Sequence, residues 1–228
     1  MSANQLAFSF PTVRRRGGAR RGAGRRPRAA HLRHTPHRTR PAHRKAHPVH
    51  VTLRAGVRSL RAQRVAQVLL RALRECNREW FRIVHYSVQE SHLHLIVESA
   101  DARALSSGVS GLMVRVARRV NALLQRRGRF WADRWHGQEL GSPRQVRNAL
   151  VYVLQNHKKH GHCLAMDASG TRLDPLSSAA SFDGFASALP RGFRGAGPPW
   201  LVTAKTWLLG RGWRRHGLIR LTEGPSSK

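Results

Sequence analysis

Residues Val88–Glu98, with the sequence VQESHLHLIVE, carry the most informative pattern of the chain. From the fifth of these residues onward, His92 and His94 alternate with Leu93 and Leu95. Successive side chains of a β-strand point to opposite faces of the sheet. The sequence therefore predicts a strand whose leucines enter a core and whose two histidines lie side by side on the other face.

This histidine pair has two interpretations. Two neutral imidazoles on one face provide two ligands of a divalent metal site. In a chain with 14 histidines, the pair also fits an ordinary strand that carries surface histidines. His-x-His is a weak signal by itself, so the choice depends on the rest of the chain.

The charge of the chain indicates its partner. The 228 residues include 42 Lys and Arg but only 11 Asp and Glu, which gives a formal net charge of +31. A protein this basic works against a polyanion, and nucleic acid is the usual one. An anionic membrane is the rival, but no apolar run approaches the roughly 18–20 residues that span a bilayer, and no signal-peptide pattern opens the chain. We therefore expect a nucleic-acid partner and no membrane.

The cysteines indicate the compartment. Cys76 and Cys163 lack the spacing of a metal site. They also provide no disulfide framework, which fits a reducing environment. We therefore expect a cytoplasmic protein.

Composition divides the chain into four regions. Residues 1–46 are rich in Arg, Gly, Pro and His and are expected not to fold alone, because they have too little apolar surface to bury. They form either a basic arm that lies along phosphates or a tail with no defined contact. Residues 47–162 form the predicted domain, 163–199 a loosely structured linker, and 200–228 a small element rich in Trp and Arg. Docking on the domain is the simpler use of these tryptophans, because a short segment needs anchors to be ordered.

Apolar spacing in the domain alternates between strand and helix patterns. It predicts strands at 47–54, 81–88, 92–98 and 130–140 and helices at 59–76, 101–127 and 142–159. Ser59 and Ser142 are predicted N-caps, and Gly128 is a predicted C-cap. This order predicts a ferredoxin-like (RRM-like) α+β fold, an antiparallel sheet with two helices on one face. The other face would stay polar and open to a ligand, with His50 and Thr52 beside the histidine pair.

Basic and aromatic side chains of the domain are candidates for nucleic-acid contacts. Tryptophan rings stack on unpaired bases, so Trp131 and Trp135 belong either to such a contact or to the core. The arginines that we expect at the nucleic acid are Arg54, Arg115, Arg118, Arg119, Arg134 and Arg147.

The third helix offers a third metal ligand and a nucleophile. Tyr152 and Asn156 are four residues apart and therefore share one helix face. If that face lies over the histidine strand, the Asn156 amide oxygen completes a metal site and the Tyr152 hydroxyl lies beside it. A tyrosine near a divalent ion and a phosphate can act as a covalent nucleophile. A structural role for Tyr152 is the alternative, and Tyr86, inside a predicted strand, is assigned to the core.

Together these motifs resemble a known family. His92-Leu93-His94 resembles the histidine–hydrophobe–histidine (HUH) motif of single-tyrosine transposases, and residues 152–156 are similar to their nucleophile helix. Residues 50–54 and 128–134 and the basic arm add to the likeness, which is greatest to the REP-associated tyrosine transposases and covers about residues 47–160.

The resemblance implies recognition of single-stranded or hairpin DNA, such as a REP-like palindrome, in a bacterial nucleoid. It implies cleavage near the hairpin foot through a 5′-phosphotyrosine on Tyr152, leaving a free 3′-hydroxyl that can rejoin strands. His92, His94 and Asn156 would hold Mg²⁺ or Mn²⁺. A monomer and a homodimer both remain open.

The chain departs from the family pattern at two positions. Ser91 stands where Asn is common before the first histidine, and His157 stands where Pro is common after the ligand Asn. Gln155 and His157 are therefore rivals of Asn156 as the third ligand.

Two other functions compete with this one. A domesticated, catalytically silent DNA- or RNA-binding protein would need the charge but not the histidines, tyrosine and asparagine together. A metal-dependent phosphodiesterase that uses activated water would need acidic ligands, for which Asp133 and Glu98 are the candidates.

Overall fold

The computed structural model describes residues 43–57, 59–160, 165–166, 172–189, 191–193 and 198–225. The predicted basic arm up to residue 42 lies outside the described residues, as does Cys163. Within the described residues, no helix is both long and apolar enough to cross a bilayer.

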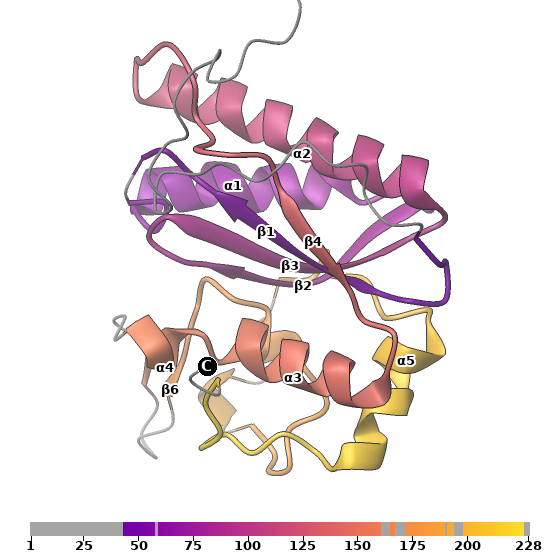
Figure 1. Cartoon of the computed structure of the whole chain (residues 1–228). Helices are drawn as coiled ribbons and strands as arrows, with labels where there is room; N and C mark the ends of the chain where they lie inside the picture. The colour runs from indigo at the N-terminus through magenta and orange to yellow at the C-terminus, as the bar shows by residue number, and fades with distance from the viewer. Residues whose placement is uncertain are drawn as a thin grey trace, which may run out of the picture. The chain divides into compact units, whose positions relative to one another are not determined.

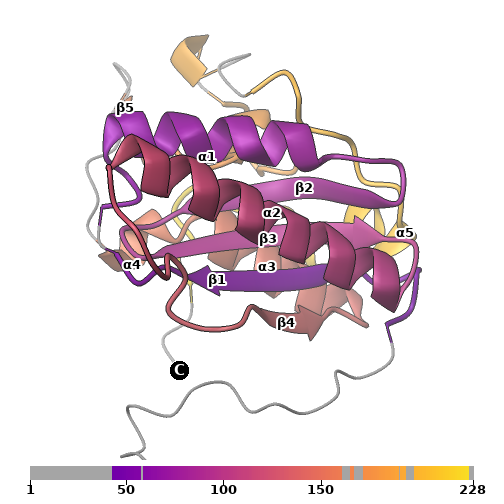
Figure 2. The same cartoon turned by 90° about the horizontal axis from the view of Figure 1, so that it is seen from above.

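A four-stranded antiparallel sheet forms the centre of the domain. Its strands are β1 (Val49–Arg54), β2 (Phe81–Val88), β3 (His92–Ser99) and β4 (His136–Glu139). They lie in the order β2-β3-β1-β4 (Figure 2). The predicted α+β class is confirmed, and β2 and β3 pair as an antiparallel hairpin joined by residues 89–91.

Two helices cover one face of the sheet, as predicted (Figure 1). They are α1 (Gln63–Cys76) and α2 (Ala102–Leu123). Their apolar stripes pack on the side chains that alternate inward from the strands, among them Leu93 and Leu95, which are both fully buried. At Gly108, helix α2 approaches the sheet so closely that a Cβ added to this residue would come within 2.3 Å of the Phe81 ring.

The other face is not open, which corrects the prediction of a polar, accessible surface. Helix α3 (Pro143–Leu154) crosses it, and the C-terminal residues pack around α3 (Figure 1). Val84 and Ile96 point to this side and join Leu150 and Trp213 in a second core. The prediction failed because Val84 and Ile96 form an apolar patch between the polar residues of this face, and α3 and the C-terminal residues bury that patch.

The remaining elements are short. They are α4 (His157–His160), β5 (Ala165–Met166), β6 (Arg172–Leu173), α5 (Trp207–Gly210) and 3₁₀ helices at Ala179–Ser181, Arg191–Phe193 and Gly212–His216. Residues 172–189, which composition assigned to a loose linker, contribute Phe182 and Phe185 to the second core. The tryptophan docking expected of the C-terminal element is confirmed at Trp213, which is 1% exposed.

Several predicted ends are wrong. Helix α1 begins at Gln63 rather than at a Ser59 cap, since Ser59 has a φ of 71°. Helix α2 ends at Leu123, and Gly128 with its φ of 90° lies in the turn beyond. The Ser142 cap is confirmed, because its side chain accepts a hydrogen bond from the Gln145 backbone N–H.

The strand predicted at residues 130–140 is shorter in the structure, where only β4 (His136–Glu139) is regular. Phe130, Trp131 and Trp135 are buried in the first core, and Trp131 Nε1 donates to the Met113 carbonyl at 2.9 Å. These rings anchor an irregular connection rather than a regular ladder, and both tryptophans belong to the core rather than to a base-stacking surface.

Candidate active site

The two histidines lie on the α3 side of β3. In the sheet register, His94 is opposite Thr52 and His92 is opposite Arg54 on β1. The two imidazole rings are nearly parallel, with centroids 6.1 Å apart and planes at 12°. The side-by-side placement predicted from alternation therefore holds.

A hydroxyl group contacts Nδ1 of each imidazole. Thr52 Oγ1 is 3.2 Å from Nδ1 of His94, and Ser91 Oγ is 2.9 Å from Nδ1 of His92. Such contacts orient an imidazole and favour one tautomer. Ser91, the departure from the family motif, thus has a defined contact with the first histidine.

Helix α3 places Tyr152 against this pair. Its ring centroid is 5.2 Å from that of His94, in an edge-to-face arrangement at 86°. The same tyrosine lies 5.5 Å from the ring of His50 on β1. The structure therefore brings the predicted nucleophile and one predicted ligand into direct contact, although α3 and β3 are distant in the sequence.

Two further histidines belong to the cluster. The sequence pattern placed His50 beside the histidine pair without giving it a role, and it did not place His136 there. The His50 ring lies 5.5 Å from that of His94, and His136 is opposite Thr52 on β4. The pKa of His50 falls to about 4, first because burial disfavours the imidazolium and second because a charged His136 would repel it. His50 is therefore neutral near pH 7. The alternation of residues in β1 indicates the face on which His50 lies. The position of His136 depends instead on how β4 pairs with β1.

The end of α3 holds the three rival ligands. The helix stops at Leu154, not at the predicted residue 159, and Asn156 follows in the turn before α4. Asn156 is fully buried, and neither its Oδ1 nor its Nδ2 has a hydrogen-bond partner among the described residues. Gln155 is engaged, since its Nε2 donates to the Arg220 carbonyl at 2.8 Å. A buried amide without partners calls for an explanation, and a bound cation is one.

The donor set can be compared with what a divalent ion needs. In the part of the chain that the structure describes, no group of three or more His, Cys, Asp or Glu is placed to hold a metal ion. The site that the motif implies would consist of the imidazoles of His92 and His94 and the amide oxygen of Asn156. Imidazole is a softer ligand than Mg²⁺ or Mn²⁺ prefers, whereas the amide oxygen and the phosphate oxygens that would fill the open positions suit these ions.

The predicted nucleic-acid arginines do not gather at one place. Arg54 is exposed and shares the sheet face of His92. Arg115, Arg118 and Arg119 lie on α2, across the sheet from the histidines, and Arg119 pairs with Glu75 at 2.6 Å.

The other two arginines have different surroundings. Arg134 is half-buried, and its backbone N–H donates to Asp133 Oδ1 at 2.7 Å. Arg147 is committed within the chain, because it donates to the carbonyls of Gly217 and Leu218 and pairs with Glu223 at 2.8 Å.

The alternative residues have structural roles. Tyr86 is 1% exposed and stacks on Trp200, and burial raises the pKa of its phenol above the usual range. Glu98 binds Thr206 at the other end of β3, and Asp133 caps the next backbone N–H. The acidic ligands of a water-activating site are therefore not assembled at the histidines.

No family model matches the chain, and no curated protein matches it by sequence. Solved structures do match it. One is a REP-associated tyrosine transposase bound to a REP hairpin, with 20% identity and a TM-score of 0.47 over 54% of this chain and 74% of that chain. Another is a Deinococcus radiodurans R1 protein classed provisionally as a transposase, with 15% identity and a TM-score of 0.35 over 50% of this chain and 83% of that chain. The first of these structures comes from the family that the sequence motifs resemble.

Proposed function

We propose that this protein cleaves and rejoins single-stranded DNA through a covalent phosphotyrosine, with hairpin DNA as its substrate. The observation that carries the proposal is the contact of the Tyr152 ring with the His94 ring at 5.2 Å. A tyrosine at this place has its phenol beside the histidine pair, where a phosphate and an ion would meet.

Three residues would hold the Mg²⁺ or Mn²⁺ ion: His92, His94 and Asn156. Such an ion offsets charge on the phosphate oxygens and favours the ionised form of an attacking phenol. A hydroxyl that accepts the Nδ1 proton of each imidazole makes Nε2 the ligating nitrogen. Thr52 and Ser91 are the hydroxyls in contact with these atoms.

The chemistry balances without a cofactor that carries energy. The Tyr152 oxygen forms a bond to phosphorus, and the bond from phosphorus to the 3′ oxygen breaks. The phenol gives up one proton and the departing 3′ oxygen gains one, so no proton is released overall. The phosphotyrosine keeps the energy of the phosphodiester, so a 3′-hydroxyl can attack it and restore the strand.

The second candidate is nucleic-acid binding without turnover. The formal charge of +31 favours it, because phosphate binding needs that charge and the chemistry at Tyr152 does not. Both candidates bind nucleic acid, and only the first forms a covalent bond to it.

A covalent-adduct assay separates them. The full chain is incubated with Mn²⁺ and a library of hairpin-forming single strands labelled at the 3′ end, because the fragment 3′ of the cut stays on the enzyme. We expect a labelled protein band that survives denaturation, and no such band with strands labelled only at the 5′ end. Strands that are bound but never cut or joined to protein would favour the silent binder.

A further inference from the structure

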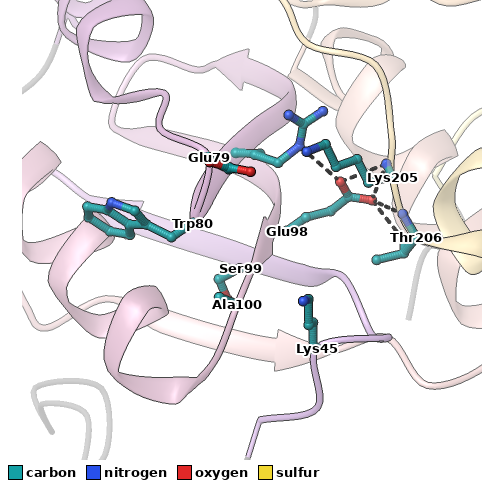
Figure 3. A pocket seen from close by; sticks show the side chains of 9 residues that line it. Lys45, Glu79, Trp80, Glu98, Ser99, Ala100, Lys205 and Thr206 are labelled. Atoms are coloured by element: carbon teal, nitrogen blue, oxygen red, sulfur yellow. Dashed lines mark hydrogen bonds and ion pairs between the residues drawn. The ribbon is translucent and has the colours of Figure 1, made fainter.

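A pocket of about 310 Å³ lies where β2 begins and β3 ends (Figure 3). Its floor includes Ser99, five residues beyond His94 on the same strand, which is about 16 Å along an extended chain. This pocket is therefore separate from the histidine cluster, and nothing in the proposed chemistry uses it.

One side of the pocket is an exposed tryptophan. The Trp80 side chain is 45% exposed, which is unusual for so large an apolar ring. Its backbone is held, since its carbonyl accepts a hydrogen bond from the Ala100 backbone N–H at 3.0 Å, and its ring centroid lies 6.4 Å from that of Phe81. An exposed aromatic ring is a surface on which an unpaired base can stack.

The other sides carry positive charge. Lys45 and Lys205 line the pocket across from Trp80, and both are exposed (Figure 3). The carboxylate of Glu98 does not cancel them, because it lies 3.5 Å from Arg82 and accepts hydrogen bonds from the backbone N–H groups of Lys205 and Thr206. The two ammonium groups therefore remain available to an anion.

The first described residue also lies at this place. Nε2 of His43 lies 2.9 Å from Oγ of Ser99, so the described chain begins against the pocket floor. In the sequence, the residues that precede it from 14 onward are rich in arginine.

From this juxtaposition we propose that the pocket binds one nucleotide of a DNA single strand, with the base stacked on Trp80 and a phosphate between Lys45 and Lys205. The carboxylate of Glu79 lines the same pocket and can accept a hydrogen bond from the amino group of a cytosine. The inference rests on the proposed single-stranded substrate, and it adds a contact point away from Tyr152.

Binding measurements on the full chain test the stacking. The probe is a fluorescein-labelled oligodeoxycytidine, followed by anisotropy. Trp80→Ala should weaken binding about tenfold, within the range of one lost base stack, and Trp80→Phe should restore most of it. The matched control is Trp207→Ala, which removes a tryptophan of 55% exposure that lies under Arg215 and outside the pocket. It should leave the affinity within about twofold of the parent.

A crosslinking arm identifies the contact directly. A strand with one iododeoxyuridine should, on irradiation, attach to the peptide that contains Trp80, and it should do so equally in the His94→Ala protein. Unchanged binding by Trp80→Ala together with crosslinks elsewhere would overturn the pocket and leave the proposed catalysis untouched. A crosslink at Trp80 without any adduct on Tyr152 would remove only the catalytic proposal. If the parent protein binds no single strand, both proposals fall.

Discussion

The Tyr152 ring meets the His94 ring edge to face, with centroids 5.2 Å apart and planes at 86°. The contact joins helix α3 to strand β3, which the second core also holds together through Leu150, two residues before Tyr152, and Ile96, two residues after His94. The ring of Tyr152 is thus part of the packing, and its hydroxyl is what the proposed chemistry uses. These two roles can be separated by substitution.

Tyr152→Phe should abolish cleavage and adduct formation while leaving hairpin binding unchanged. The substitution keeps the ring and removes one oxygen, so the free energy of unfolding should change by no more than about 1 kcal/mol. A covalent mechanism has no replacement for that oxygen. The measurements are the adduct assay, hairpin affinity and urea unfolding.

Tyr86→Phe is the control, because Tyr86 is the other tyrosine of the chain and is buried away from the cluster. It should cleave at the parental rate. Cleavage without an adduct by the Tyr152→Phe protein, or an adduct that maps to Tyr86, contradicts the assignment.

His92→Ala and His94→Ala should each remove cleavage, and EDTA should do the same to the parent protein. Binding to hairpin DNA should persist in all three cases, because it depends on the basic surface rather than on the imidazoles. His216→Ala, at an exposed histidine of the C-terminal 3₁₀ helix, is the matched control and should cleave normally. Full activity of either cluster variant, or of the parent in EDTA, excludes the metal role.

Deleting residues 1–42 should weaken binding to all DNA alike and flatten the dependence of log Kd on log salt. Each phosphate contact that is lost removes its share of counterion release. Truncation at this point keeps the structural contacts of the next residues, since His47 Nδ1 lies 2.8 Å from Glu139 Oε1. The measurement is a salt series with hairpin and unrelated duplexes. A truncated protein with the parental slope would show that the arm does not contact DNA.

Asp174→Asn should destabilise the fold by about 3 kcal/mol, because it leaves the Arg61 guanidinium buried without its carboxylate. Arg61 bonds both oxygens of Asp174, and their side chains are 11% and 1% exposed. Asp183→Asn breaks the exposed pair with Arg214 and should cost less than about 1 kcal/mol. Urea unfolding of the two variants measures the difference, and equal losses would contradict the structural role of the buried pair.

Stability should fall in mild acid partly because of His85. Burial lowers its pKa to about 4 from a usual 6.5, against a smaller opposite effect of Asp183. The unfolded chain therefore binds this proton at a higher pH than the folded chain does. Neutral His85 therefore makes its full contribution to the free energy of unfolding above pH 6.5, and this contribution is lost as the pH falls toward 4.

The size of this effect is at most about 3 kcal/mol. The free energy of unfolding is measured for the parent protein and for His85→Gln at a series of pH values from neutral down to about 4. His50 has a shift of the same sign and stays in both proteins, so only the difference between the two curves reports His85. Parallel curves would exclude the contribution.

The part of the fold that sequence predicted is the part specified by local periodicity. Alternation in β3 placed Leu93 and Leu95 in the core and His92 and His94 together on the other side. A serine before proline located the start of α3. These signals involve only neighbouring residues, so they can be read without knowledge of the partner strand or helix.

The features that sequence did not predict depend on distant pairs. Nothing in the sequence around Arg61 indicates that it will bind Asp174. Yet this ion pair connects the segment predicted as a linker to the residues just before α1. The covered sheet face also depends on contacts between distant residues, since Val84 and Ile96 pack with Leu150 of α3 and with Trp213. The addition of His136 to the cluster likewise requires the register of β4 on β1, which a short strand of mostly exposed residues does not reveal.

Strand β3 carries His92 and His94 at its beginning and Glu98 near its end, all on one face. A shift of one residue in the pairing of a strand turns every side chain to the opposite face. A shifted β3 would therefore turn both histidines away from Tyr152 and, in the same movement, turn Glu98 away from Lys205 and Thr206. The hydrogen bonds between Glu98 and the C-terminal element and the assembly of the histidine cluster therefore require the same register of β3.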